Sequence, residues 1–358
     1  MKNIISKKYC FAIAVCTMVL TSNGLNAKPP ITGKPVIVSP ENLLEWPRDF
    51  KKRKPDLTEP TANRLNDFHG VIGRCDMSVS TAGNYHMALR EIWQIYLRKY
   101  ARRYGIKTWF YTTSPPISPK QVANSLVQFG NLDVRCKPMV AIGPKKLIKK
   151  LKAMRVTQGR DVPIVKNYGN VILVRKGNPK NIRSVWDLGR KDVTLVTPNP
   201  YKEKGSFGNF SGSIYNVAAS DPNPPAGMTA KKLFNSIFNT DQSGCTNGGK
   251  CKWVAGKRIM HREQPWAVAS GKADAGFIFY HLALYFTRTF PDKFEIVPVG
   301  GTASRPRPAK GNKIGVMRAI RVKGRWTRNQ IRAREALFRT LQSRAFTRIL
   351  KRHGLRRP

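Results

Sequence analysis

The sequence predicts an α/β fold with mainly parallel sheets. Short apolar, β-branched runs alternate along the chain with longer helical patterns, and small or polar residues mark the turns between them. The 358 residues exceed what one compact core usually holds, so we expect one large or two smaller domains. A hydrophobic fraction of 41% is sufficient for such cores.

The first 27 residues are typical of a secretory signal peptide. Lysines near the start precede an apolar run over residues 9–20, and residues 21–27 are small and polar. The apolar run is too short for a stable membrane anchor. We expect cleavage after Ala27 and a periplasmic or extracellular protein; an uncleaved anchor is the less favoured alternative.

Residues 28–74 are rich in proline and charge, so we expect an extended N-terminal lead-in with at most one short helix. Strands and helices alternate from Cys75 onward. In the first half we expect strands at 76–80, 108–111, 138–142 and 170–174, and helices at 85–104, 121–129 and 144–154. In the second half we expect strands at 193–196, 273–279, 294–299 and 314–322, and helices at 184–188, 228–238, 266–272 and, as one helix or two, 327–353.

The chain is strongly basic, with 65 Lys and Arg residues against 20 Asp and Glu residues and a net charge of +45. A polyanion partner, such as nucleic acid or anionic lipid headgroups, is one explanation. The other is a solvated surface in an acidic exterior, where carboxylates lose their charge. The basic residues are spread along the chain, and no zinc-finger, RRM or helix-turn-helix signature is present. We therefore favour the second explanation and do not expect nucleic acid as a partner.

Four cysteines follow the signal segment: Cys75, Cys136, Cys245 and Cys251. An even number in an exported chain indicates disulfides, with three possible pairings. Cys245 and Cys251 bracket a short polar loop, which favours that pair and leaves Cys75 to bond with Cys136. We expect no metal, because the sequence has no CxxC motif and no His at ligand spacing from the cysteines.

Three predicted strand-to-helix junctions carry small hydroxyl or amide side chains. The first N–H groups of a helix have no partner within the helix and lie at its positive end, so such junctions can bind an anion. In open α/β sheets, ligands bind beyond the carboxyl ends of the strands. Any single junction is more often an ordinary helix cap, but three in one protein favour a shared cleft. The expected ligand-binding residues are Ser80, Thr81 and Asn84 at the first junction, Thr113 and Ser114 at the second, and Asn199 and Ser206 at the third.

Catalytic signals in the sequence are weak. No GxSxG, Walker, HExxH or dinucleotide-binding motif occurs in the right context, so we expect a protein that is not an enzyme and carries no cofactor. His261, Arg262 and Glu263 bring an acid, a base and a cation together, but surface charge is the more common explanation of such a cluster. The other histidines, including His281, are isolated and are expected to be structural.

Three segments resemble periplasmic substrate-binding proteins of the molybdate and sulfate type, which belong to the type II superfamily. These are residues 170–200, with Leu-Val-Arg-Lys-Gly-Asn-Pro and Trp-Asp-Leu-Gly, residues 268–276, with Val-Ala-Ser-Gly-Lys-Ala-Asp-Ala-Gly, and residues 345–355. The resemblance implies two Rossmann-like lobes joined by a two-strand hinge, which close on the ligand. The implied lobes comprise residues 75–170 with 285–358, and residues 171–284.

The resemblance also implies a monomeric receptor that delivers a small anion to an ABC permease in the inner membrane. The anion would be an oxyanion such as molybdate or sulfate, or a small organic anion. Further ligand contacts are implied near Phe279 and Tyr280, and we add Arg262 as a source of positive charge. A molybdate binder usually has Tyr where this chain has Phe279, so the resemblance gives the ligand by class only. The alternative is a basic envelope protein whose surface binds a polyanion or a protein partner.

Overall fold

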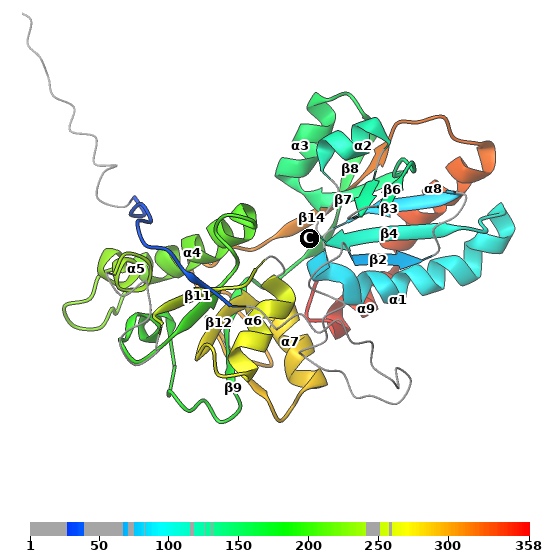
Figure 1. The fold of residues 1–358 in the computed structure, drawn as a ribbon. Coiled ribbons are helices and arrows are strands. Elements are labelled where there is room, and N and C mark those ends of the chain that lie inside the picture. Colours follow the sequence, from blue (N-terminus) through cyan, green and yellow to red (C-terminus); the bar gives the residue numbers. More distant parts are fainter. Residues whose placement is uncertain are drawn as a thin grey trace, which may run out of the picture.

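The computed structural model describes residues 27–38, 67–70, 75–81, 83–114, 118–125, 127–129, 132–240, 251–257 and 260–358. Within these residues the chain forms two six-stranded sheets, A and B, and a small two-stranded sheet, β5 (Val127–Phe129) with β6 (Leu132–Val134). Figure 1 shows sheets A and B in two separate lobes, each with its own helices. The predicted α/β class and the two-lobed architecture are confirmed.

Sheet A has the strand order β1-β11-β10-β12-β9-β13. The first four strands run parallel, whereas β9 is antiparallel to both of its neighbours. Its strands are β1 (Val36–Ile37), β9 (Asn170–Arg175), β10 (Leu195–Thr197), β11 (Trp253–Ala255), β12 (Ala275–Phe279) and β13 (Phe294–Val297). Its helices are η6 (Val185–Gly189), α4 (Lys204–Ala219), α5 (Ala230–Phe238), α6 (Met260–Ala269) and α7 (Tyr280–Thr289).

Sheet B has the strand order β2-β4-β3-β7-β14-β8. The strands β4, β3 and β7 run parallel; β2 and β14 are antiparallel to their neighbours. Its strands are β2 (Asp67–Gly70), β3 (Met77–Ser80), β4 (Trp109–Ser114), β7 (Val140–Pro144), β8 (Thr157–Lys166) and β14 (Val316–Val322). Its helices are η3 (Gly83–Tyr85), α1 (His86–Tyr96), η4 (Leu97–Ala101), η5 (Arg102–Tyr104), α2 (Pro119–Asn124), α3 (Lys145–Ala153), α8 (Arg328–Leu341) and α9 (Arg344–Arg352).

Both sheets are therefore mixed rather than mainly parallel. The parallel strands of each sheet are linked through helices, as βαβ connections require. The strands β9 and β14 instead enter their sheets directly from the other lobe, and both run antiparallel to the strands beside them. The sequence pattern predicted these two strands but not their antiparallel direction. That direction follows from the chain entering each sheet from the other lobe.

Two chain segments cross between the lobes, as the resemblance implied. One connects β8 to β9, and the other precedes β14. Asparagines join them: Asn167 N donates to Gly315 O (3.0 Å), Asn170 N donates to Asn312 Oδ1 (2.9 Å), and Asn312 Nδ2 donates to Asn170 O (2.8 Å). All three asparagines are buried, so these hydrogen bonds between the two crossing segments are shielded from water.

The second crossing lies later in the chain than the expected boundary at residue 285. The strand β13 pairs with β9 in sheet A, so the chain is still in the sheet A lobe at Val297. The return to sheet B begins at β14. We propose residues 312–315, rather than the region near 285, as the second boundary between the lobes.

The N-terminal lead-in contributes an edge strand to each sheet. The strand β1 pairs with β11 in parallel, and Val38 N donates to Ala255 O (2.8 Å). Farther along, β2 pairs with β4 in sheet B. The described chain starts at Ala27, whose carbonyl accepts a hydrogen bond from the Tyr215 hydroxyl (3.2 Å). The rest of the predicted signal segment lies outside the described residues.

The core of the sheet B lobe is divided by the sheet into two layers. Val140 and Ile142 of β7 pack with α1, α8 and α9, whereas Ala141, between them, packs with α3 on the opposite face. This is the two-residue alternation of a strand that is covered on both sides.

The predicted disulfide between Cys75 and Cys136 is present, with the two Cα atoms 5.8 Å apart.

The other disulfide prediction involves a residue outside the described part of the chain. Cys251 is disulfide-bonded, and Cys245, its predicted partner, is not described.

The predicted helix at 121–129 is wrong in its second half. Ser118 caps α2 through Gln121 N (3.2 Å), but the helix ends at Asn124 because Ser125 takes a left-handed conformation (φ 62°). Residues 127–129 then form β5.

No helix in the described residues has the length and apolar character that a membrane crossing requires.

Candidate functional site

The first two predicted junctions lie at one edge of sheet B. The parallel strands β3 and β4 are neighbours, and Ser80 pairs with Thr112. Thr113 and Ser114 follow at the carboxyl end of β4; their side chains are not among those described. Thr81 comes directly after β3, so the backbone brings both junctions together as the sequence predicted.

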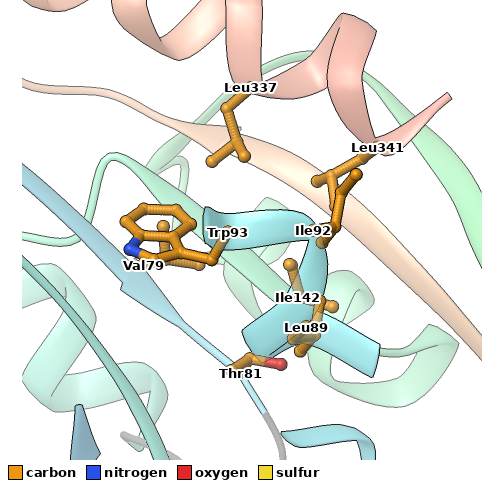
Figure 2. Close-up of a pocket in the computed structure, with 8 residues that line it drawn as sticks. All are labelled: Val79, Thr81, Leu89, Ile92, Trp93, Ile142, Leu337 and Leu341. Carbon is orange, nitrogen blue, oxygen red and sulfur yellow. The ribbon is translucent and has the colours of Figure 1, made fainter. Parts of the chain in front are cut away.

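Two buried polar atoms at this edge have no hydrogen-bond partner. They are Thr81 Oγ1 and Asn84 Oδ1. Thr81 is only 1% exposed, and Asn84 lies three residues later in η3, the turn that leads into α1. Figure 2 shows Thr81 beside a small pocket whose other labelled side chains, from β3, α1, β7 and α8, are all apolar. An unpaired hydroxyl in such surroundings costs about 1–3 kcal/mol of stability.

The third junction lies at the corresponding edge of sheet A. The neighbouring parallel strands β10 and β11 end at Thr197 and Ala255, which are paired in register. Asn199 ties the two strand ends together, because its Nδ2 donates to Gly256 O (3.0 Å) and Lys257 O (3.2 Å). Its Oδ1 accepts hydrogen bonds from Tyr201 N (2.9 Å) and Lys202 N (3.0 Å). The side chain of Asn199 thus shapes the turn, and all of its hydrogen-bonding capacity is in use.

A carboxylate of the protein already lies at the start of α6. Glu203 Oε2 accepts a hydrogen bond from Met260 N (3.0 Å), the first residue of that helix. This contact shows the preference of a helix N-terminus for a negative charge. Arg262 lies half-buried in the first turn of α6, and Ser206 lies half-buried in the first turn of α4.

His281 connects the two sheet edges. It lies in the first turn of α7, on the sheet A lobe, and its Nε2 donates to Asn84 O (2.8 Å) on the sheet B lobe. Its ring is stacked between Tyr85 and Phe279, with centroids 5.0 and 5.6 Å away. The carboxyl ends of β10, β11 and β12 share one edge of sheet A. The hydrogen bond between His281 and Asn84 brings that edge against the carboxyl end of β3.

The protonation state of His281 follows from its surroundings. Burial lowers the pKa of His281 to about 4, so the ring is neutral at pH 7. Because Nε2 contacts a carbonyl oxygen, it carries the hydrogen, and Nδ1 is an acceptor. Nδ1 is buried and has no partner. Asn84 Oδ1 and Asn170 Oδ1 are likewise buried without a partner where the lobes meet.

The remaining predicted contacts lie close to this junction. Phe279 pairs with Asn170 in the sheet and packs against His281. The Tyr280 hydroxyl donates to Ala303 O (3.0 Å), so it is engaged within its own lobe. The sequence analysis expected His281 to be structural and did not place it at the ligand site, although it directly follows Phe279 and Tyr280; that adjacency was the available signal. No group of three or more His, Cys, Asp or Glu side chains that could hold a metal occurs in the described part of the chain.

The sequence of residues 77–356 matches the family model of the bacterial extracellular solute-binding proteins. The chain belongs to this family. Its members are binding proteins of the cell exterior, which agrees with the two lobes and the junction between them. None of the curated proteins matches the sequence.

Solved structures with the same fold are distant in sequence. AgtB of A. tumefaciens R10, in complex with agropinic acid, has 11% identity and a TM-score of 0.50, over 78% of this chain and 81% of that one. Peb3 from Campylobacter jejuni has 16% identity and a TM-score of 0.47, over 79% and 100%. The Azotobacter vinelandii periplasmic molybdate-binding protein has 14% identity and a TM-score of 0.48, over 79% and 99%.

Proposed function

We propose that this solute-binding protein captures a small anionic solute at the junction between its lobes and delivers it to an ABC permease. The observation that supports the proposal is the set of three unpartnered buried acceptors where the lobes meet, Asn84 Oδ1, Asn170 Oδ1 and His281 Nδ1. Buried polar atoms are nearly always hydrogen-bonded, so three at one interface between lobes call for a ligand that bonds with them. Such a protein needs no catalytic residue, and it acts as a monomer.

The sign of the ligand's charge follows from the surrounding helix termini and the whole chain. The turn η3 starts at Gly83, next to Asn84, and leads into helix α1 at His86, so the positive end of a helix lies beside the unpartnered Asn84 Oδ1. The net charge of +45 also steers anions toward the protein.

The unpartnered atoms also restrict the chemistry of the anion. Asn84 Oδ1 and His281 Nδ1 accept hydrogen bonds and cannot donate them. A fully deprotonated oxyanion has no hydrogen to offer. Of the two ligand classes expected from the sequence, the acceptors therefore favour an organic anion with hydroxyl groups, or an oxyanion that retains a proton, over sulfate or molybdate.

A thermal-shift screen at high salt tests the proposal, followed by calorimetric titration. The probes are sulfate, molybdate, phosphate and small hydroxy acids such as lactate and glycerate. A ligand that binds the folded state raises the melting temperature, by an amount that grows with the logarithm of its concentration above Kd, and high salt suppresses surface binding. We expect a shift with a hydrogen-bond-donating anion. The proposal fails if no small anion shifts the melting temperature.

Two variants, one inside β3 and one directly after it, locate the site. Thr81→Val removes the unpartnered hydroxyl at the carboxyl end of β3, the first predicted junction, and should weaken binding of the ligand found in the screen at least about tenfold. Ser78→Ala is the matched control, because the Ser78 hydroxyl is equally buried and unpartnered but lies inside β3. Equal losses in the two variants would place the ligand elsewhere.

A further inference from the structure

The helices α1, α8 and α9, with the turns η4 and η5, form one layer over one face of sheet B. Their buried residues belong to a single core, whereas α3 packs in the core on the opposite face. Figure 1 shows α1 and α9 on one side of this sheet and α2 and α3 on the other. We call this set of helices and turns the arginine layer, because of the side chains on its outer surface.

Each helix of the layer presents a row of cations to solvent. On α8 the exposed cations are Arg328, Arg332 and Arg339, and on α9 they include Arg344, Arg348 and Lys351. These spacings of four, seven and three residues place each set on one helix face. Over residues 316–358 the chain has 14 Lys and Arg residues and a single acid, Glu335. The exposed cations of α8 and α9 therefore lie on the outer surface of the layer, on one side of the lobe.

The two acids of the layer are already paired. Glu335 bonds with Arg321 (2.5 Å) and Arg334 (3.1 Å), and Glu91 bonds with Arg352 and His353 (both 2.5 Å). Neither carboxylate is left to balance the exposed arginines. The layer thus has a surplus of cations that no described protein group neutralises.

The layer contains two open grooves with a common composition. One, of about 500 Å³, is lined by Arg90, Arg98 and Arg352 and includes Tyr285 of α7, which is 39% exposed. The second, of about 410 Å³, is lined by Arg103, Arg332 and Arg339 and includes Ile331, which is 40% exposed. Each groove thus combines three guanidinium groups with one exposed apolar side chain and one carboxylate, Glu91 or Glu335, which is already ion-paired.

We propose that the arginine layer is a docking surface for an anionic lipid membrane. Guanidinium groups bind phosphate in a bidentate manner and are weakly hydrated, which suits lipid headgroups. The exposed Tyr285 and Ile331 match the boundary between headgroups and acyl chains. The cations cover several helices rather than one track, which fits a planar array of phosphates better than a nucleic acid backbone. Membrane docking confines the protein to the membrane surface, so it finds the permease by diffusion in two dimensions.

Vesicle co-sedimentation at low and high salt tests the proposal, with full-length mature protein. The probes are phosphatidylcholine vesicles with and without phosphatidylglycerol. The test variant replaces Arg90, Arg98, Arg332 and Arg339 with Gln. The matched control replaces Lys145, Lys146, Lys149 and Lys150 of α3 with Gln, which removes the same charge from the opposite face of the sheet. Among the described residues, none of these eight cations has an acidic partner.

We expect binding only to vesicles with phosphatidylglycerol, and less binding at high salt. The arginine variant should partition at least about tenfold more weakly than the wild type, and the lysine variant should lose less than about threefold. Equal losses in both variants would mean diffuse attraction and would overturn the proposal. So would tight binding to a DNA duplex, lost in the arginine variant, without binding to the anionic vesicles.

Discussion

Thr81 illustrates a conflict between stability and function within a single side chain. Its hydroxyl is buried, has no partner and adjoins an apolar pocket (Figure 2). Valine has the same shape without the hydroxyl. We expect Thr81→Val to raise the free energy of unfolding by about 1 kcal/mol in urea titrations, because an unpaired polar group is removed from the core. A variant that is less stable than the wild type would show that the hydroxyl has a structural partner.

Lys252 is a second buried side chain with a specific task. Its ammonium group donates to Leu188 O (2.6 Å), Arg190 O (2.7 Å) and Val193 O (2.7 Å), at the end of η6. Burial lowers the pKa of Lys252 to about 8, which still leaves the group mostly protonated at pH 7. We expect Lys252→Met to lower the free energy of unfolding by about 2–4 kcal/mol, because three carbonyls lose their donor.

Lys272→Met is the control for this substitution, because Lys272 is an exposed lysine of the same lobe. Its effect should stay within about 0.5 kcal/mol. If chemical denaturation gave equal values for the two variants, the carbonyls around Lys252 would have to be solvated by water instead.

Single residues were predictable from the sequence only where their role is local. Ser80 and Thr81 could be placed at a strand end because the helical pattern starts directly after them. The role of His281 could not be predicted, because its partner Asn84 is 197 residues away in the chain. Asn199 shows the opposite case: its position was predicted, but its four hydrogen bonds serve the turn.

At the scale of elements, the lead-in strand β1 extends sheet A at its edge. Its backbone bonds to β11, and Val36 and Val38 pack against the core of the lobe. Val38→Pro removes the N–H group that donates to Ala255 O, and we expect a loss of about 1–3 kcal/mol in the free energy of unfolding. Ile37→Thr is the control, because Ile37 is 44% exposed. A neutral Val38→Pro would show that the lead-in does not stabilise the lobe.

The elements that the sequence analysis missed have weak patterns. The strand β8 contains Gly159 among exposed polar residues and Pro163 among apolar ones, so it lacks the apolar alternation of a typical strand. The start of α4 was predicted at the third junction, but its extent was not, because Gly205, Gly208 and Gly212 interrupt its pattern, although its apolar side is buried in the core. By contrast, α3 and β9 are found close to their predicted positions, because strong periodicity or a continuous apolar run marks each of them.

At the scale of the whole molecule, the two lobes meet at the crossing segments and at His281. The fold class and the two crossings were predictable, because one family-like segment begins at the first crossing and others lie on both sides of the second. The second boundary was not, because β13 joins sheet A through pairing with β9, and no local signal encodes that partner. How the sheet edges approach each other depends on contacts such as the one between Asn84 and His281, which only the folded molecule defines.

The contact at His281 makes the molecule sensitive to acid. The pKa of His281 is about 4 in the folded state, against 6.5 as its ordinary value. Between these values the unfolded chain binds a proton that the folded protein does not, so the free energy of unfolding falls as the pH drops from 6.5 toward 4. The decrease is at most about 1.4 kcal/mol per pH unit from this residue. Its protonation would place a charge between Tyr85 and Phe279, at the interface of the lobes.

The variant His281→Phe retains an aromatic ring in the stack but cannot titrate. It should be less stable than the wild type at pH 7, because Asn84 O loses its donor, yet its stability should fall less steeply between pH 6.5 and 4. Urea titrations of both proteins at several pH values measure the two slopes. Small-angle scattering over the same range reports whether the lobes of the wild type separate before they unfold. Parallel slopes would assign the acid sensitivity to other pairs, such as Glu91 with His353, and would remove His281 from the interface that closes the site.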